Sequence, residues 1–231
     1  VEVGLLEDVA TLALDASGAG LNRRGYRTMN AEAPIIETLA AGLVLLSGYR
    51  GGGPFLDPMC GSGTIAIEAA LIAKNRAPGI QREFAAEEWP FLPKNFWKAE
   101  RERAVALERP GPLKDIFASD IDESVLKLAR FHAKKAGVAL PFARADATRL
   151  SRSDTGGRLV CNPPYGERLS DRRSCEALYE KMGRAFSTLT GWQAVIISSH
   201  PGFEKSFGRR ADKRRKIYNS GLPCQAYIYK F

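Results

Sequence analysis

The chain has 231 residues, 45% of them hydrophobic and 26% charged, which excludes a disordered tail and, with 22 Gly and 13 Pro, a collagen-like protein. Its apolar runs are shorter than the roughly 18 residues of a membrane span, and Val1-Glu2-Val3-Gly4 is unlike a secretion signal. We therefore expect a cytoplasmic protein without membrane contact, whose start reflects processing or excision. The net charge of +8 favours a polyanionic partner over a plain solvated surface.

The first elements are a hairpin and a helix. Residues 9–27 open with alternating apolar positions, turn at Ser17-Gly18-Ala19-Gly20 and end in a basic run, which is typical of a hairpin. From Pro34, a favourable first-turn residue, apolar side chains between Ile35 and Leu46 recur at helical spacing. We expect this helix to pack on a larger core.

From residue 55 onward, short apolar segments alternate with amphipathic ones. One helix is predicted at 64–73. A second is predicted after residues 116–120, with Asp122 as its expected N-cap. This alternation predicts an α/β fold with a mostly parallel sheet and helices on both faces. Residues 78–115 interrupt the pattern with Pro, Trp and charge, so we expect an insertion that is helical around 95–107. The strand candidates are residues 55–57, 116–120, 139–143, 159–161, 194–198 and 226–229.

A glycine-rich turn, Asp57-Pro58-Met59-Cys60-Gly61-Ser62-Gly63-Thr64, joins the first of these strands to its helix. Gly61 and Gly63 lack a Cβ atom, so a ligand would lie against bare backbone at the start of the helix. The spacing Gly61-x-Gly63-x-x-Ala66 also satisfies the dinucleotide fingerprint, and a plain tight turn is the structural alternative. The carboxylate of Asp57 beside the turn favours a ligand with an ammonium and a sulfonium over a pyrophosphate.

Further aspartates stand at the ends of later strands. Asp120 is placed to accept hydrogen bonds from a ribose, although Asp122 competes for that role and such residues also cap helices. Asp146 follows the next strand and is placed either to accept from an adenine amino group or to cap nearby backbone. Together with the glycine turn, these acids predict a nucleoside-binding site at one edge of the sheet.

The tetrapeptide Asn162-Pro163-Pro164-Tyr165 directly follows the strand candidate 159–161. The exocyclic amine of a nucleobase is a weak nucleophile because its lone pair is delocalised into the ring. The Asn162 side-chain oxygen and the Pro163 carbonyl are both able to accept from that amine and aim its lone pair at an electrophilic methyl group. The two prolines fix their own φ angles, so these acceptors are held in place beforehand. Tyr165 offers a ring on which an extruded base would stack; the alternative is an ordinary turn.

Two basic clusters indicate nucleic acid as the partner. One is Arg23-Arg24-Gly25-Tyr26-Arg27, and the other is the run from Arg209 to Lys216, in which six of eight residues are cations. The four cysteines and two histidines lack metal-ligand spacing, so no metal site is predicted, and Cys60 and Cys161 are interpreted as small buried hydrophobes. The RNA-binding candidates are Arg23, Arg24, Arg27, Arg209, Arg210, Lys213, Arg214 and Arg215.

The combination of motifs resembles the bacterial 23S rRNA guanine-N2 methyltransferases. The resemblance spans residues 11 to about 230 and is carried by Leu21–Arg27, Ala33–Ala41, Asp57–Thr64, Ser119-Asp120, Asn162–Leu169 and Ala211–Lys213. It implies a class I S-adenosylmethionine (SAM)-dependent methyltransferase, Rossmann-like, with a seven-stranded sheet whose last strand is antiparallel. The chain departs from the family pattern at Asn22 and Ile36, and the usual preceding THUMP domain, which binds RNA, is missing, so the chain looks like an excised catalytic domain.

The resemblance assigns a role to each motif. Asp57, Gly61 and Gly63 would line the methionine end of SAM, Asp120 the ribose and Asp146 the adenine, while Asn162–Tyr165 would hold the target base. Residues 1–30 would form a hairpin and linker, and residues 31–231 the methyltransferase domain with its insertion at about 78–115. The full set of cofactor candidates is Asp57, Pro58, Cys60, Gly61, Ser62, Gly63, Thr64, Asp120, Ile121, Asp146, Ala147 and Asn162.

Other functions remain open from the sequence. The same tetrapeptide serves methyl transfer to adenine N6 or to a protein glutamine amide, although the basic surface favours RNA. A cytosine-C5 mechanism needs a cysteine nucleophile after a proline pair, whereas Cys161 precedes Asn162-Pro163-Pro164. An NAD-dependent oxidoreductase is supported only by the glycine fingerprint, and a noncatalytic RNA-binding module only by the charge.

Overall fold

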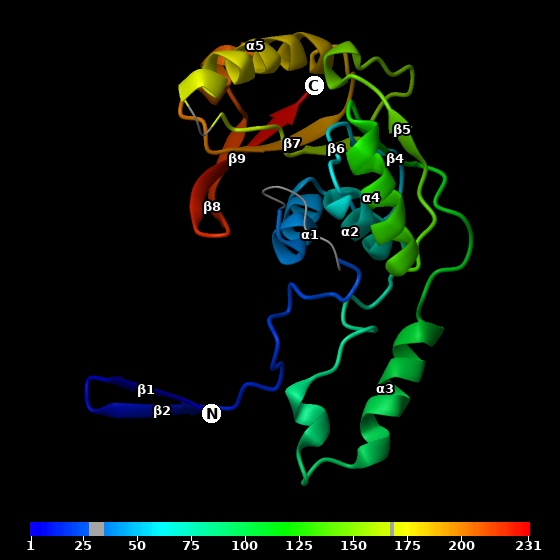
Figure 1. Cartoon of the computed structure of the whole chain (residues 1–231), viewed down its shortest axis with the longest axis vertical. Coiled ribbons are helices and arrows are strands. Elements are labelled where there is room, and N and C mark those ends of the chain that lie inside the picture. The colour runs from blue at the N-terminus through cyan, green and yellow to red at the C-terminus, as the bar shows by residue number, and fades with distance from the viewer. Residues whose placement is uncertain (28–34, 167–168) are drawn as a thin grey trace.

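The computed structural model describes residues 1–27, 35–166 and 169–231, and its centre is one seven-stranded sheet (Figure 1). Five neighbouring strands run parallel, and β9 runs antiparallel to both β7 and β8. The mostly parallel sheet and its antiparallel last strand are therefore confirmed. Across the sheet the order is β5 (Phe142–Arg144), β4 (Ile116–Asp120), β3 (Phe55–Asp57), β6 (Arg158–Cys161), β7 (Gln193–Ser198), β9 (Leu222–Lys230) and β8 (Lys213–Asn219).

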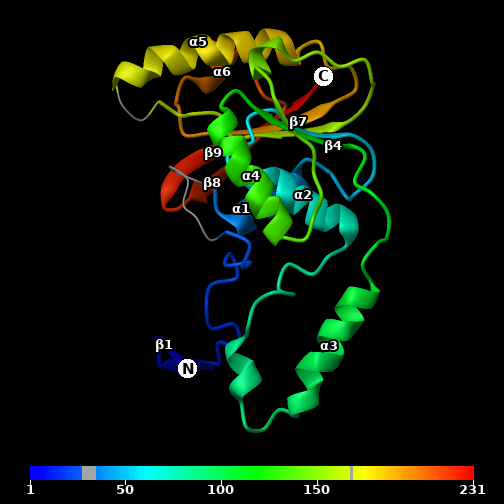
Figure 2. The same cartoon turned by 45° about the vertical axis from the view of Figure 1, so that its right-hand side comes forward.

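Helices cover both faces of this sheet (Figures 1 and 2). The first face carries α1 (Glu37–Leu46), α2 (Thr64–Lys74) and α4 (Glu123–Lys135), and the second carries α5 (Leu169–Phe186) and α6 (Phe203–Phe207). Side chains of β7 alternate between the two apolar cores: Val195 and Ile197 join the first, Ala194 and Ile196 the second. A strand buried on both faces reads as a continuous apolar run, which is why β7 was predictable.

The N-terminal hairpin lies earlier than the sequence predicts. It consists of β1 (Glu2–Leu6) and β2 (Val9–Ala13), which pair in register from Glu2↔Ala13 to Leu6↔Val9. Glu7 and Asp8 both have positive φ, 49° and 63°, so they form a two-residue turn whose twist matches the strands. The hairpin predicted over residues 9–27 is wrong: the chain bends at Ala16 and Ala19, but residues 14–27 form no strand. Carbonyl groups of this segment, those of Ser17, Ala19 and Gly20, instead accept hydrogen bonds from Arg82.

The insertion at 78–115 forms an arm beside the N-terminal segment. It contains the short 3-10 helix η1 (Ala85–Glu88) and α3 (Lys94–Ala106), which confirms the helix predicted around 95–107. Figure 2 shows α3 projecting away from the sheet. The arm is tied to the N-terminal segment by Arg82 and by the hydrogen bond from the Ala86 N–H to the Ala16 carbonyl, 3.2 Å.

Several boundaries differ from the prediction for physical reasons. Pro34 lies outside the described residues, and α1 begins at Glu37. The strand predicted at 139–143 begins only at Phe142, after Pro141, which has no N–H to donate to a neighbouring strand. β9 is longer than predicted because it also pairs with β8, an edge strand that begins within the basic run 209–216. Within the described residues, every helix falls short of what crossing a bilayer requires.

Candidate active site

The glycine-rich loop Asp57–Thr64 connects the carboxyl end of β3 to α2. β3 lies between β4 and β6, the point at which the strand order reverses, and ligands of open α/β sheets bind at such points. Two hydrogen bonds hold the loop against the end of β4. The Cys60 N–H donates to the Ser119 carbonyl, 2.9 Å, and the Gly61 N–H donates to Asp120 Oδ2, 2.9 Å. The predicted strand, turn and helix are confirmed.

Gly61 and Gly63 are required for different reasons. Both have positive φ, 51° and 87°. A Cβ atom on Gly63 would lie 3.0 Å from the Ala129 Cβ and 3.3 Å from the Phe142 ring, so this glycine lets α2 pack closely against α4 and β5. A Cβ atom on Gly61 would meet nothing within 4 Å. The Gly61 side of the loop is therefore open to a ligand, whereas Gly63 serves packing.

Asp57 is fully buried at the end of β3, and neither carboxylate oxygen has a hydrogen-bond partner in the structure. Burial raises the pKa of this carboxyl well above its ordinary value, and the negative charge of Asp120 raises it further. The backbone amides of Met59 and Ala66 lower the pKa without making a hydrogen bond of normal geometry. A buried carboxyl without a partner is costly, and a cationic ligand group would relieve that cost.

Asp120 and Asp122 differ in what their carboxylates bind, and the ribose contact of Asp120 stays a prediction. Asp120 accepts from two backbone amides, Gly61 N–H at 2.9 Å and Asp122 N–H at 3.0 Å, and a carboxylate retains lone pairs for further donors. Asp122 caps α4 by accepting from the Ser124 N–H, 2.8 Å. The Ser124 hydroxyl and this N–H together hold the pKa of Asp122 below its ordinary value. The helix-capping alternative thus describes Asp122. Ile121, between them, is 60% exposed.

Asp146 occupies the capping position that was the alternative to adenine binding. Its Oδ1 accepts from the Thr148 N–H, 2.9 Å, and from the Thr148 hydroxyl, 2.7 Å, at the start of the 3-10 helix η2 (Ala147–Arg149). These hydrogen bonds hold the pKa of Asp146 below its usual range. Ala147 is buried beneath it. An adenine contact from Asp146 stays a prediction.

The tetrapeptide Asn162–Tyr165 leaves the carboxyl end of β6, the strand beside β3. Leu56 of β3 is level with Leu159 of β6, and paired strands are about 4.8 Å apart. The tetrapeptide and the glycine loop therefore emerge side by side at one edge of the sheet. This adjacency is what a transfer between ligands on the two loops requires.

Within the tetrapeptide, the Tyr165 hydroxyl donates to Asn162 Oδ1 at 2.6 Å. The Tyr165 ring is half-buried against the core under α1 and α2, and burial raises its pKa. Pro163 is buried, and the Pro164 carbonyl accepts from the Tyr179 hydroxyl of α5 at 2.5 Å. Stacking of a base on Tyr165 stays a prediction. Tyr179 was missed because a tyrosine on an amphipathic helix reads as part of the core.

Both cysteines near the site are buried. Cys60 and Cys161 have thiols whose pKa is raised by burial and by the nearby carboxylates of Asp57 and Asp120. A thiol with a raised pKa is a poor nucleophile, which agrees with their interpretation as small hydrophobes. In the described part of the chain, no group of three or more His, Cys, Asp or Glu side chains is placed to hold a metal ion.

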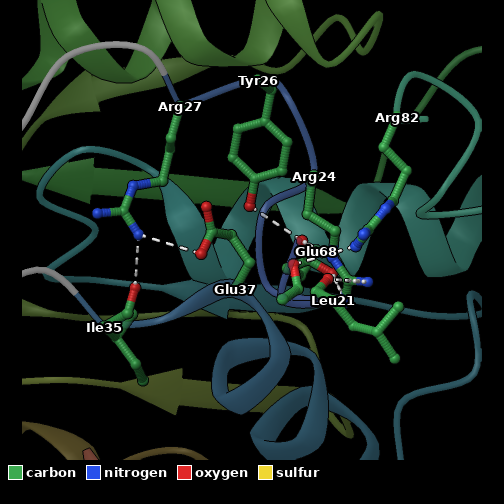
Figure 3. A network of polar contacts seen from close by, with 9 residues as sticks. Leu21, Arg24, Tyr26, Arg27, Ile35, Glu37, Glu68 and Arg82 are labelled. Atoms are coloured by element: carbon green, nitrogen blue, oxygen red, sulfur yellow. Dashed lines mark hydrogen bonds and ion pairs between the residues drawn. The ribbon is translucent and has the colours of Figure 1, made fainter. Parts of the chain in front are cut away.

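The first basic cluster is mostly engaged within the protein (Figure 3). Arg24 forms a two-pronged ion pair with the buried Glu68 of α2, with atoms 3.2 and 3.3 Å apart, and the Tyr26 hydroxyl donates to the same carboxylate at 2.9 Å. Arg27 pairs with Glu37 of α1 at 3.4 Å. The side chains of Arg24 and Arg27 are 11% and 14% exposed. Of the three arginines predicted to contact RNA in this cluster, only Arg23 is exposed.

The second basic cluster is divided by the alternation of β8. Arg214 points toward α6 and pairs with Glu204, 2.5 Å, whereas Lys213 and Arg215 stand opposite Ile228 and Ala226 on the face that carries α1. Arg209 donates to the Lys230 carbonyl and lies over the Phe231 ring. Arg210, Lys213 and Arg215 are exposed and have no ion pair among the described residues. These three cations and Arg23 remain available to a polyanion.

Comparisons with known proteins agree with this geometry. Residues 24–228 match the family described as "RMKL-like, methyltransferase domain". A relative from Bacillus subtilis (strain 168), described as "Putative RNA methyltransferase YpsC", is 44% identical over 99% of this chain. A solved structure from Listeria monocytogenes, described as a predicted N6-adenine-specific DNA methylase, superposes with a TM-score of 0.90 at 42% identity over 98% of the chain. SMU.472, described as a "putative methyltransferase complexed with SAH", gives a TM-score of 0.85 at 39% identity over 98% of the chain.

The chain spans only part of these relatives: 60% of the Bacillus protein, 59% of the Listeria structure and 60% of SMU.472. The family match nevertheless covers nearly the whole chain, from the Arg24 ion pair to β9. The seven-stranded sheet with helices on both faces is that of the class I methyltransferase fold. The chain belongs to the family of RMKL-like methyltransferase domains.

Proposed function

We propose that this domain transfers a methyl group from SAM to the exocyclic N2 amine of a guanine in 23S rRNA. The observation that carries the proposal is the emergence of the glycine loop and the Asn162–Tyr165 turn from the adjacent strands β3 and β6. A loop open to a ligand lies next to a turn rich in fixed hydrogen-bond acceptors. The choice of guanine N2 in 23S rRNA as the methyl acceptor rests on the resemblance to the guanine-N2 methyltransferases.

The residues of the first loop fit SAM. The unpartnered carboxylate of Asp57 suits the ammonium of its methionine part, and the open side of Gly61 leaves room for the ligand against bare backbone. Asp120 retains lone pairs for ribose hydroxyls while it holds the loop. When bound, SAM supplies an electrophilic methyl group on a sulfonium. The related SMU.472, described as complexed with SAH, supports this assignment.

The residues of the second loop hold the nucleophile. Asn162 Oδ1 and the Pro163 carbonyl accept the two N–H bonds of the target amine, which directs its lone pair toward the methyl group. Because both acceptors are set by the strand end and the proline pair, little reorganisation is needed when the base arrives. Positioning is the main catalytic contribution, since a direct displacement needs no covalent intermediate.

The RNA would approach across the exposed cations. Arg210, Lys213 and Arg215 belong to β8 or the segment before it, at the sheet edge beyond β7 and β9, and Arg23 lies on the N-terminal segment. Phosphate neutralisation by these residues would favour RNA over an uncharged substrate. The net charge of +8 and the relative described as an RNA methyltransferase support RNA as the substrate class.

One experiment tests the proposal. Unmodified 23S rRNA is incubated with labelled SAM and the protein, and the methylated nucleoside is identified by mass spectrometry. We expect label in N2-methylguanosine, and none with Asn162→Ala, whose folding is checked by its binding of S-adenosylhomocysteine (SAH). Label in no nucleoside of the RNA, with the wild-type protein saturated with SAM, would overturn the proposal.

Adenine N6 is the second candidate target. The Listeria structure, which is 42% identical, is described as a predicted N6-adenine-specific DNA methylase. The same acceptor pair would hold an N6 amine equally well. Parallel reactions with 23S rRNA and with duplex DNA separate the two target bases. N6-methyladenosine in the RNA, or N6-methyl-2′-deoxyadenosine in the DNA, in place of N2-methylguanosine would move the assignment to adenine.

A further inference from the structure

A series of buried hydrogen bonds connects α5 and the end of β7 to the Asn162–Tyr165 turn. The Tyr179 hydroxyl of α5 donates to the Pro164 carbonyl at 2.5 Å and lies 3.4 Å from the Ser198 hydroxyl at the end of β7. Ser198 Oγ accepts from the His200 N–H at 3.1 Å, and His200 Nδ1 accepts from the Gly202 N–H at 3.1 Å. The side chains of Tyr179, Ser198 and His200 are buried.

The direction of each hydrogen bond follows from which atoms carry protons. Tyr179 uses its only proton toward Pro164, a carbonyl that is solely an acceptor, so the Ser198 hydroxyl must donate to the Tyr179 oxygen. Ser198 then accepts from the His200 backbone. His200 Nδ1 accepts from Gly202, which leaves its other ring nitrogen as the donor, 3.6 Å from Glu176 of α5. Donors and acceptors therefore run in one direction from the β7–α6 turn to the Asn162–Tyr165 turn.

The hydrogen bonds end at a torsion that the two prolines leave free. Proline fixes φ at Pro163 and Pro164, and the following proline keeps Pro163 extended, but ψ of Pro164 is not restricted in this way and sets the direction in which the backbone continues to Tyr165. A hydrogen bond to the Pro164 carbonyl fixes that torsion. Tyr179 itself is further held by edge contacts with the rings of His200 and Phe203, with ring centroids 5.6 and 4.8 Å apart.

We propose that Tyr179, backed by Ser198, is a positioning residue for methyl transfer that holds the Pro163–Tyr165 backbone in the geometry that accepts the target amine. This inference rests on the proposed function. Tyr179 acts through Pro164 and does not touch the substrate, so its loss lowers the rate of the chemical step while cofactor and RNA affinity stay unchanged.

The test compares Tyr179→Phe with Tyr229→Phe. Tyr229 is a matched control because it is buried in the same core and its hydroxyl also donates to a backbone carbonyl, that of Arg209, at 3.3 Å. We expect Tyr179→Phe to lower kcat for RNA methylation about tenfold or more, with unchanged KM for RNA and unchanged Kd for SAH. Tyr229→Phe should lose as much thermal stability and keep its kcat within about twofold.

A second readout does not depend on activity. Hydrogen exchange of the peptide that contains Tyr165 and Gly166 should become faster in Tyr179→Phe and stay unchanged in Tyr229→Phe. Ser198→Ala, which removes the next link, should show both effects in the same direction and provides the test if Tyr179→Phe folds poorly. An unchanged kcat with unchanged exchange, or an equal loss of kcat in Tyr229→Phe, would overturn the positioning role. A wild-type protein that methylates no RNA would overturn the proposed function instead, and the exchange result would then decide the role of Tyr179 by itself.

Discussion

The hydroxyl of Tyr165 donates to the side-chain oxygen of Asn162 at 2.6 Å, so the proposed amine acceptor already has a donor in this structure. A target amine that takes the same oxygen must displace this hydroxyl or share the lone pairs with it. The Tyr165 hydroxyl is therefore engaged with Asn162, whereas the predicted stacking of the base concerns only the Tyr165 ring.

Tyr165→Phe separates these two contributions. It keeps the ring and removes the hydroxyl, so we expect methyl transfer in single turnover to stay within about threefold of wild type. Tyr165→Ala removes the ring as well and should lose about 1–3 kcal/mol of stacking, a drop of about 5- to 150-fold. Rapid-quench measurements on both variants would decide this, and equal losses in Phe and Ala would show that the hydroxyl is the important group.

Asp57 should make stability depend on pH. Its folded-state pKa is raised by burial, whereas the unfolded value is about 3.9, so between these values the unfolded state is ionised and the folded state holds the proton. The free energy of unfolding should therefore fall as pH rises above about 4 and level off above the folded pKa. Asp57→Asn should remove that component and weaken SAH binding. Urea unfolding at several pH values, without ligand, checks the slope; an identical slope in the variant would contradict it.

Asp120 should matter to the cofactor and Asp122 should not. Asp120→Ala removes the acceptor of the Gly61 amide and the predicted partner of the ribose, and we expect SAH binding to weaken by about 1.5–3 kcal/mol. Asp122→Ala removes the cap of α4, which should lower the melting temperature while SAH affinity is retained. Calorimetric titration with SAH and thermal melts of both variants measure this, and the opposite pattern would give the ribose to Asp122.

Arg23 and Arg24 are neighbours with opposite expected effects. Arg24→Ala leaves the buried Glu68 without its ion pair and should lower the free energy of unfolding by about 3 kcal/mol. Arg23→Ala removes an exposed charge, so we expect unchanged stability and weaker RNA binding. Chemical unfolding together with RNA titrations distinguishes them. A loss of stability in Arg23→Ala equal to that in Arg24→Ala would refute this division.

The cations of β8 should differ in the same way. The double variant Lys213→Ala with Arg215→Ala should flatten the dependence of RNA affinity on salt by about one to two phosphate contacts. Arg214→Ala, whose side chain pairs with Glu204, should change the salt slope less. Filter binding between low and high salt gives both slopes, and a slope unchanged in the double variant would remove this edge from the RNA surface.

The sequence alone determined the parts of this protein that depend on short-range pattern. The buried strand β7 is a continuous apolar run, the helix after β4 begins at a capping aspartate, and the glycine loop and the Asn162–Tyr165 turn stand where strand candidates end. Parallel strands bring such ends to one edge of a sheet, so the pattern predicted both loops at the same edge. That β3 and β6 are neighbours, which brings the two loops together, was decided by the strand order.

Only the tertiary structure decided which side chains are free. Arg23 and Arg24 are indistinguishable in sequence, because the partner that buries Arg24 is Glu68, 44 residues away. The basic run gave no sign that it forms β8, since an edge strand exposed to solvent lacks the apolar alternation of a buried one. Tyr179 likewise acquires its role from Pro164, a contact between a helix and a loop. Hydrogen bonds and ion pairs depend on partners that are distant along the chain, whereas periodicity records only which face is buried.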